Sequence, residues 1–264
     1  MPYISVNGAR IHYRVSGIGP ETILFAHGIF FSSQIFKNQV DYFKARYRCI
    51  EFDFRGQGMS EETEFGYDMD MLLADVVELI KKLKLGPCHV AGSCMGGFVA
   101  LRLAIRHREL VKSLILIGTS AETEPLKLKL NSFKIIIRYF SVSVLVNKLV
   151  SLLFSSSTID DPSRQEEMAF WKNTFLIKKK SVFKALGGYI DRPGISDQLG
   201  IISMPTLILV GEDDKMTSPQ KSKNLKLNIP QATLSIIKEA GHAVVVDQPW
   251  KVTETMEVFL NGVH

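Results

Sequence analysis

Short apolar runs alternate along this chain with segments in which apolar residues recur at helical spacing. Two runs near the start, Tyr3–Val6 and Arg10–Val15, flank Asn7-Gly8, a dipeptide that favours a tight hairpin turn. Thr22–Ala26 forms a continuous apolar run, which is typical of a strand buried on both faces. The same criteria predict strands at Arg48–Phe52, Cys88–Ala91, Val111–Ile117, Thr206–Val210 and Thr233–Ile237, and helices at Gln34–Ala45, Tyr67–Leu85, Gly96–Arg106, Gln220–Leu227 and Pro249–Leu260.

The alternation stops over residues 119–198, where only helical patches occur. One such patch spaces its apolar residues by threes and fours from Leu126 to Phe140. Repeated strand–helix units with short connections predict an α/β fold with a mostly parallel sheet flanked by helices. We therefore expect one core domain, residues 1–118 and 199–264, into which a helical lid, residues 119–198, is inserted.

Composition and charge narrow the class of protein. The chain has 264 residues, of which 46% are hydrophobic and 22% charged, as in ordinary globular proteins. Its formal net charge of +5 is too small to indicate nucleic-acid binding. The most apolar segment, Ile135–Phe154, contains Arg138 and Lys148, and central charges cost roughly 2.5–3.5 kcal/mol each on insertion scales, so no membrane span is expected. The odd cysteine count and the lack of a signal-peptide pattern predict a cytoplasmic protein with reduced thiols.

The sharpest local motif is Gly92-Ser93-Cys94-Met95-Gly96, between a predicted strand and a predicted helix. A Gly-x-nucleophile-x-Gly turn in this context is the nucleophile elbow, whose small flanking residues leave room for neighbouring backbone. Cys94 fits the central position. Ser93 does not, because Ala91 and Met95 would then occupy the glycine positions. The alternative is that Cys94 is a small buried apolar residue, an interpretation that suits Cys49 and Cys88 because both lie in predicted strands.

Acidic and histidine residues follow the ends of later strands. Asp213 and Asp214 come after the strand that ends at Val210, and His242 follows the strand that ends at Ile237. Active sites of open parallel sheets gather at the carboxyl ends of their strands. These side chains are therefore expected to lie at the same edge of the sheet as Cys94.

Taken together, these motifs resemble the α/β-hydrolase superfamily. Besides the elbow, the chain has His27-Gly28 after an early strand, Asp53–Ser60 in the pattern Asp-x-Arg-Gly-x-Gly-x-Ser, and Gly241-His242 near the end. The resemblance extends from Tyr3 to Leu260 apart from residues 119–198. Most members of the superfamily have serine at the elbow, whereas dienelactone hydrolases and polyhydroxyalkanoate synthases have cysteine there.

The resemblance implies a catalytic triad, with Cys94 as nucleophile, His242 as general base and Asp214 as the acid that orients it. Asp213 is the competing acid, and Glu122 and Glu124 are more remote alternatives, placed by their sequence position at the entrance of the lid.

The resemblance also implies an oxyanion hole made by the backbone N–H groups of Ile29 and Met95. Gly92, Gly96, His27 and Gly28 would support the elbow and this loop, with His27 acting through hydrogen bonds. No His, Cys or Asp cluster shows the spacing of metal ligands, and no glycine-rich loop has nucleotide-binding spacing, so no cofactor is expected.

The predicted lid carries 12 Lys and Arg and 8 Asp and Glu, so most of the excess positive charge lies there. The simplest interpretation is a helical cap with a buried apolar stripe and solvated lysines. A sharper one is an apolar acyl pocket with a basic rim, which would attract a small acyl substrate carried on an acidic carrier or coenzyme. Candidate pocket residues are Phe30, Phe133, Phe140 and Trp171.

These observations predict a hydrolase that cleaves a carboxylic ester, lactone or thioester through a covalent thioester acyl-enzyme. An acyltransferase that passes the acyl group to an amine, alcohol or thiol would use the same residues. A non-catalytic, ligand-binding relative is a third hypothesis, but it has no need of a complete triad. A serine enzyme whose nucleophile had been replaced by cysteine would show the same pattern.

Overall fold

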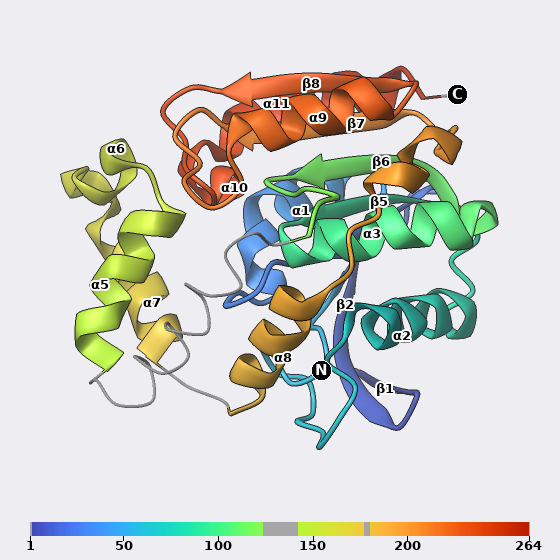
Figure 1. Cartoon of the computed structure of the whole chain (residues 1–264), viewed down its shortest axis with the longest axis horizontal. Coiled ribbons are helices and arrows are strands. Elements are labelled where there is room, and N and C mark those ends of the chain that lie inside the picture. The colour runs from blue at the N-terminus through green and yellow to red at the C-terminus, as the bar shows by residue number, and fades with distance from the viewer. Residues whose placement is uncertain (1, 124–141, 177–179, 264) are drawn as a thin grey trace.

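An eight-stranded sheet forms the centre of the computed structural model, which describes residues 2–123, 142–176 and 180–263 (Figure 1). The strand order is β1-β2-β4-β3-β5-β6-β7-β8, with antiparallel pairing of β1 to β2 and of β2 to β4 and parallel pairing elsewhere. The predicted mostly parallel sheet is therefore confirmed. The strands are β1 (Tyr3–Val6), β2 (Ala9–Ser16), β3 (Thr22–Ala26), β4 (Arg48–Phe52), β5 (Cys88–Ser93), β6 (Val111–Ile117), β7 (Thr206–Gly211) and β8 (Ala232–Ile237).

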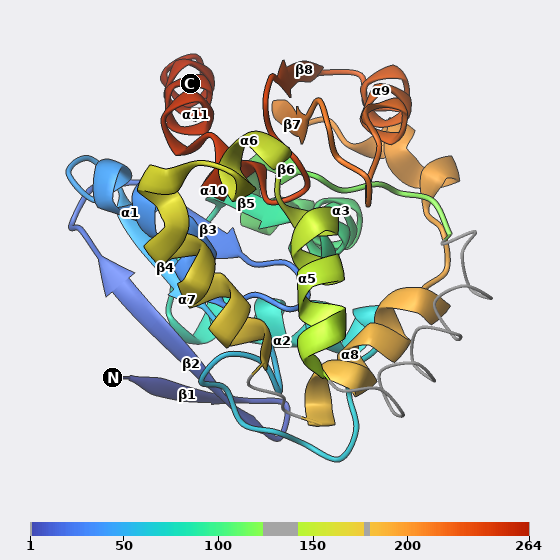
Figure 2. The ribbon, with the colours of Figure 1, turned by 90° about the vertical axis from the view of Figure 1, so that its left-hand side faces the viewer.

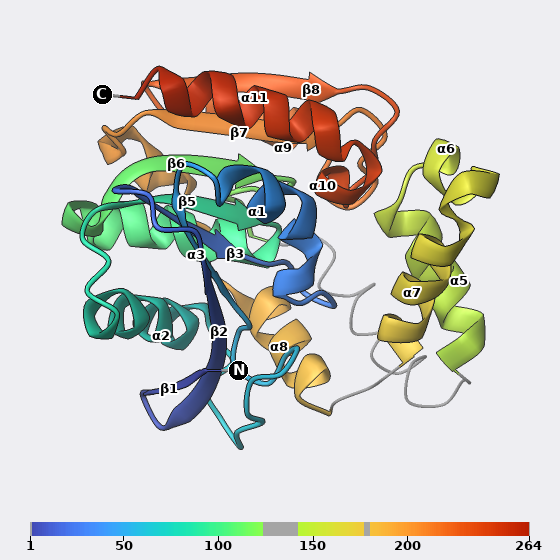
Figure 3. The same ribbon diagram turned by 180° about the vertical axis from the view of Figure 1, so that it is seen from behind.

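Helices cover both faces of this sheet. Figure 2 shows α1 (Lys37–Phe43) and α11 (Pro249–Asn261) on one side, and α3 (Met95–Arg106) and α9 (Pro219–Asn228) on the other. The view from behind in Figure 3 brings α1 and α11 to the front, whereas α2 (Met69–Lys82) packs against α3. Because each inner strand is buried on both faces, its successive side chains enter two different apolar clusters.

The element boundaries differ from the predicted ones where local hydrogen bonding decides them. The predicted helix at 34–45 divides into a 3₁₀ turn, Ser33–Phe36, and α1. Helix α2 starts at Met69 because Asp68 caps it, its Oδ1 accepting the backbone N–H groups of Asp70 and Met71 at 3.1 and 2.9 Å. The single-turn helix α10 (Val244–Asp247) was not predicted, since four residues are too few to show a helical period.

The segment from 119 to 198, called the inserted segment below, contains no strand among its described residues. These form α5 (Val142–Leu153), α6 (Ser156–Ile159), α7 (Gln165–Leu176) and α8 (Lys180–Asp191), with a 3₁₀ turn at Pro162–Arg164. A second 3₁₀ turn, Ser196–Ile201, extends three residues past the predicted end of the segment. Helices α5, α6 and α7 lie on the side toward which the arrowheads of β6 and β8 point (Figure 1). These three helices therefore lie at the carboxyl ends of the parallel strands. Within the described ranges, no helix is long and apolar enough to cross a membrane.

Candidate active site

Cys94 is the single residue between β5 and α3, at the tight turn that its motif predicts. Its φ of 47° and ψ of −111° lie outside the regions that cysteine normally adopts, and its N–H donates to the carbonyl of Ile117 at 2.8 Å. The side chain stands at the amino terminus of α3, where the helix dipole favours negative charge. Cys94 is 3% exposed.

The two glycines of the elbow are required by close backbone contacts. A Cβ at residue 92 would lie 2.5 Å from the carbonyl oxygen of Gly96, and one at residue 96 would lie 2.0 Å from that of Ala26. Any side chain at either position would push the strand, the turn and the helix apart. The small residues of the motif are thus a condition of its geometry.

His242 and Asp214 form a buried pair beside this turn. Nδ1 of His242 lies 2.9 Å from Oδ2 and 3.1 Å from Oδ1 of Asp214. The carboxylate can only accept, so Nδ1 carries the proton and Nε2 is left to face another group.

That other group is Cys94. Burial by itself lowers the pKa of His242, but the charge of Asp214 and its hydrogen bonds, together with the neighbouring Cys94, raise this pKa well above its usual 6.5. The structure therefore brings together Cys94, His242 and Asp214, in the order that proton transfer from the thiol requires.

The competing acids are placed differently. Asp213, adjacent in sequence, is exposed, whereas Asp214 is 4% exposed. Glu122 is half-buried and accepts a hydrogen bond from the side chain of Asn224 on α9 at 2.9 Å. Glu124 lies outside the described residues. Of the acids that can be compared, Asp214 is the one that contacts His242.

His27 organises the loop that follows β3. Its Nε2 accepts the backbone N–H of Phe54 at 2.9 Å, and Nδ1 lies 2.8 Å from the carbonyl oxygen of Gly28, so the ring joins two loops. Burial lowers the pKa of His27, which keeps the imidazole neutral as this pairing requires. Gly28 lies against Cys94, because a Cβ there would be 3.1 Å from the Cβ of Cys94.

Met95 directly follows Cys94, and Ile29 directly follows Gly28, which lies against Cys94. Gly96 donates its N–H to the carbonyl of His27 at 3.1 Å, which fastens the loop of Ile29 to the start of α3. Among the described residues, neither the Ile29 nor the Met95 amide has a protein acceptor. Both amides are thus available to a ligand oxygen.

The chain has many relatives with this fold. The sequence profile of the alpha/beta hydrolase fold family matches residues 21–249. The chain belongs to the α/β-hydrolase family. It is 23% identical over 261 residues to the (E)-2-((N-methylformamido)methylene)succinate hydrolase of Acinetobacter baylyi, covering 96% of this chain and 95% of that protein.

Solved structures of the family superimpose closely. A thermophilic esterase of Thermogutta terrifontis matches with a TM-score of 0.91 and 25% identity over the whole of both chains. The enol-lactonase of Burkholderia xenovorans LB400 matches with a TM-score of 0.91 and 23% identity over 98% of this chain and all of that one. The predicted fold and the prediction of an enzyme of the α/β-hydrolase class are confirmed.

The predicted pocket residues of this α/β hydrolase lie at two different cavities. Phe30, next to Ile29, lines a cavity of about 260 Å³ together with Thr174 and Val182 of the inserted segment. Trp171 lines a separate cavity of about 650 Å³, and its ring also packs edge-on against Phe31 at 5.3 Å between centroids. Phe133 and Phe140 lie outside the described residues.

Cys49 and Cys88 have surroundings unlike those of Cys94. Both are fully buried in strands, and burial raises the pKa of each thiol to about 12. In the described ranges, no group of three or more His, Cys, Asp or Glu side chains is arranged to hold a metal ion.

Two residues near the triad were not identified from the sequence. Gly118, after β6, adopts a φ of 52° beside the His242–Asp214 pair. Asp247 is a buried carboxylate that accepts the N–H of Gly241 at 2.7 Å. A single carboxylate directly after the buried run Val244–Val246 is the signal that marks Asp247 in the sequence.

Proposed function

We propose that this α/β hydrolase cleaves a carboxylic ester, lactone or thioester through a thioester formed on Cys94. The observation that carries the proposal is the placement of His242, which pairs with Asp214 through Nδ1 and whose pKa is raised by Asp214 and by the neighbouring Cys94. The esterase and the enol-lactonase among the structural relatives support an ester or lactone as the substrate class.

Each residue has a defined part in the proposed reaction. Because the pKa of His242 is raised well above 6.5, Nε2 takes the thiol proton before attack; Sγ of Cys94 then attacks the carbonyl carbon, and Asp214 stabilises the imidazolium. The amides of Ile29 and Met95 stabilise the oxyanion, a contribution of roughly 3–4 kcal/mol per donor.

Three proton transfers then complete the cycle. His242 returns its proton to the leaving alcohol or thiol, and the acyl group remains on Cys94 as a thioester. Water attacks this thioester and gives a proton to His242, which passes it back to Sγ as the acid leaves.

We also propose that the inserted segment acts as a lid that bounds the acyl site. Thr174 and Val182 of this segment line the 260 Å³ cavity beside Phe30, the residue that follows Ile29. The positive charge of the inserted segment supports an acyl group carried on an acidic carrier or coenzyme.

Intact-protein mass spectrometry with a panel of aryl esters, lactones and acyl thioesters tests the proposal. The wild-type protein is expected to gain the mass of one acyl group, and Cys94→Ala is expected to gain none. Turnover in Cys94→Ala is expected to fall by roughly 10⁴-fold or more, the usual cost of removing a nucleophile.

Cys49→Ala serves as the matched control, because Cys49 is a buried thiol in β4 remote from the elbow. It is expected to acylate as the wild type does. Hydrolysis that survives Cys94→Ala at wild-type rates would refute the proposal. Added amines or alcohols distinguish the two acyl acceptors: new amide or ester products indicate acyl transfer, and free acid alone indicates hydrolysis. Coenzyme A thioesters, compared with neutral thioesters of the same acid at low salt, test the acidic carrier.

A further inference from the structure

Asp247 joins the loop of His242 to the inserted segment. Asp247 is 3% exposed, and its Oδ2 accepts two backbone N–H groups, from Gly241 at 2.7 Å and from Ser155 at 3.0 Å. Gly241 directly precedes His242, whereas Ser155 lies between α5 and α6. One carboxylate oxygen therefore links two segments that are far apart in the sequence.

The backbone of the same loop also touches the end of α5. A Cβ at residue 241 would lie 2.9 Å from the carbonyl carbon of Phe154 and 3.1 Å from the carbonyl oxygen of Leu153. On the other side of His242, Ala243 donates its N–H to the carbonyl of Leu153 at 2.7 Å. Both neighbours of His242 are thus tied to the inserted segment, one through Asp247 and one directly.

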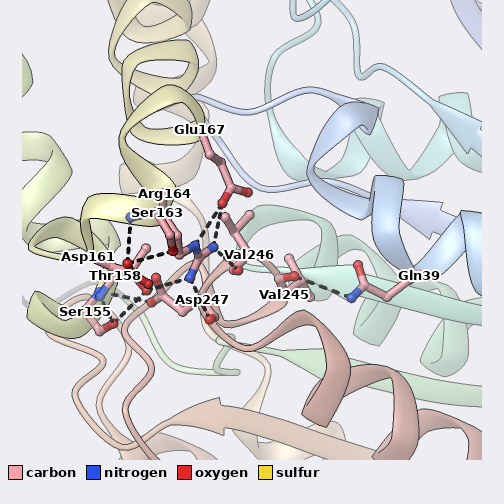
Figure 4. A network of polar contacts seen from close by, with 10 residues as sticks. All are labelled: Gln39, Ser155, Thr158, Asp161, Ser163, Arg164, Glu167, Val245, Val246 and Asp247. Atoms are coloured by element: carbon pink, nitrogen blue, oxygen red, sulfur yellow. Dashed lines mark hydrogen bonds and ion pairs between the residues drawn. The ribbon is translucent and has the colours of Figure 1, made fainter.

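Helix α10, which carries Asp247, is held from two sides (Figure 4). Arg164, in the turn before α7, donates to the carbonyl oxygens of Val246 at 2.7 Å and of Asp247 at 2.9 Å. Gln39, on α1, donates to the carbonyl of Val245 at 3.4 Å. The carboxylate therefore has a fixed place relative to both the core and the inserted segment.

The charge of Asp247 is costly where it lies. Burial raises the pKa of this carboxyl, although the two amides and the Arg164 guanidinium favour its anion. An ionised acceptor forms hydrogen bonds roughly twice as strong as those of a neutral one. The free-energy cost of burying this charge is thus offset in part by strong, oriented hydrogen bonds at the loop of His242.

We propose that Asp247 is a positioning residue for His242, and that its carboxylate couples the seating of the inserted segment to the orientation of the imidazole toward Cys94. The inference rests on the proposed function, because it assumes that His242 serves the Cys94 thiol. A movement of the inserted segment that separates Ser155 from Asp247 would release the loop, so the triad is complete only while the segment is seated.

Two substitutions test this role. Asp247→Asn keeps the shape and one acceptor oxygen but removes the charge, and Asp247→Ala removes the acceptor. The first readout is the pKa of His242 without substrate, measured from the NMR signals of labelled histidine as a function of pH. The signal that is missing in His242→Gln is assigned to His242. The second is the rate constant of acylation in a single turnover with an aryl ester.

Both the pKa of His242 and the acylation rate are expected to change more in Asp247→Ala than in Asp247→Asn. The pKa of His242 should fall from its raised value toward 6.5, more in Asp247→Ala than in Asp247→Asn. Acylation should slow about tenfold in Asp247→Asn and up to about 100-fold in Asp247→Ala, the scale of a 1 Å misplacement, while KM changes by less than about threefold. If Asp247→Ala does not fold, Asp247→Asn supplies both readouts.

Asp75→Asn is the matched control. Asp75 is a buried carboxyl whose pKa is also raised by burial, but it pairs with Arg55 at 2.8 Å and makes no contact with the loop of His242. It is expected to lower the Tm and to leave the His242 titration and the acylation rate unchanged. The proposal would be overturned if the Asp247 variants kept the wild-type pKa of His242 and the wild-type acylation rate. It would also be overturned if Asp75→Asn shifted the pKa of His242 by the same amount. Absence of a Cys94 adduct in the wild type would instead refute the proposed function, while the titration still tests the positioning of His242.

Discussion

Asp214 contacts Nδ1 of His242 with both of its carboxylate oxygens, at 2.9 and 3.1 Å. Oδ1 also accepts the backbone N–H groups of Met216 and Thr217, at 2.8 and 2.7 Å. The turn after β7 therefore sets the orientation of the carboxylate, and the carboxylate in turn sets the tautomer of the imidazole. The proposed chemistry depends on both of these contacts, from the turn to Asp214 and from Asp214 to His242.

Replacement of Asp214 by asparagine should abolish most activity without unfolding the protein. An amide N–H facing Nδ1 would place the imidazole proton on Nε2. Nε2 could then no longer accept the proton of the thiol. We expect kcat to fall by roughly 10³–10⁴-fold, with little change in KM. Asp213→Asn is the control, and steady-state kinetics should remain within about twofold of the wild type because Asp213 is exposed. A large loss of kcat in Asp213→Asn with little loss in Asp214→Asn would instead identify Asp213 as the acid that pairs with His242.

Gly118→Ala should impair catalysis more than folding. Gly118 has a φ of 52°, and a Cβ there would lie 3.3 Å from Oδ2 of Asp214 and 3.4 Å from Nδ1 of His242. The backbone strain alone costs roughly 1–2 kcal/mol. Gly86→Ala imposes a similar strain at a φ of 65°, with no atom within 4 Å of its Cβ. Urea unfolding should therefore show similar losses for both variants, whereas kcat should fall only for Gly118→Ala, and equal kcat values would contradict the interpretation.

Cys94 should be the thiol that reacts in the folded protein. Burial raises the pKa of Cys49 and of Cys88 to about 12, so neither has an appreciable thiolate fraction at pH 8. Iodoacetamide at pH 8 should add one group by intact mass, and none to Cys94→Ala. All three thiols should react in denaturant. Labelling of a second cysteine under native conditions would be inconsistent with the burial of the two strand thiols.

The contribution of His242 to stability should depend on pH in one direction. The pKa of His242 in the folded state is raised well above 6.5, despite burial, by Asp214 and Cys94. Its stabilising effect is therefore fully present below about pH 6.5 and is lost as pH rises through the raised value. The difference in unfolding free energy between the wild type and His242→Gln, from urea titrations at pH 6 to 10, should shrink as pH increases. A difference that grows with pH would be contrary to this assignment.

Much of the fold follows from local patterns. The bounds of β3, β4 and β6 agree with those predicted. In β3 the reason is that a strand buried on both faces must be apolar at nearly every position. The elbow also follows from a local pattern, Gly92-Ser93-Cys94-Met95-Gly96, although the contact that requires glycine at residue 96 is with Ala26 of β3. Boundaries such as the start of α2 depend on single side-chain hydrogen bonds, which an apolar period does not reveal.

The sequence by itself determined the class of fold, the frame around Cys94 and the edge of the sheet where His242 and an acid must meet. It left Asp213 and Asp214 as alternatives, and only the tertiary structure separated them, by burying one and exposing the other. The link from Asp247 to Ser155 likewise joins residues separated by 92 positions. Hydrogen bonds of this kind form only when distant segments pack together, so no local pattern of residues specifies them.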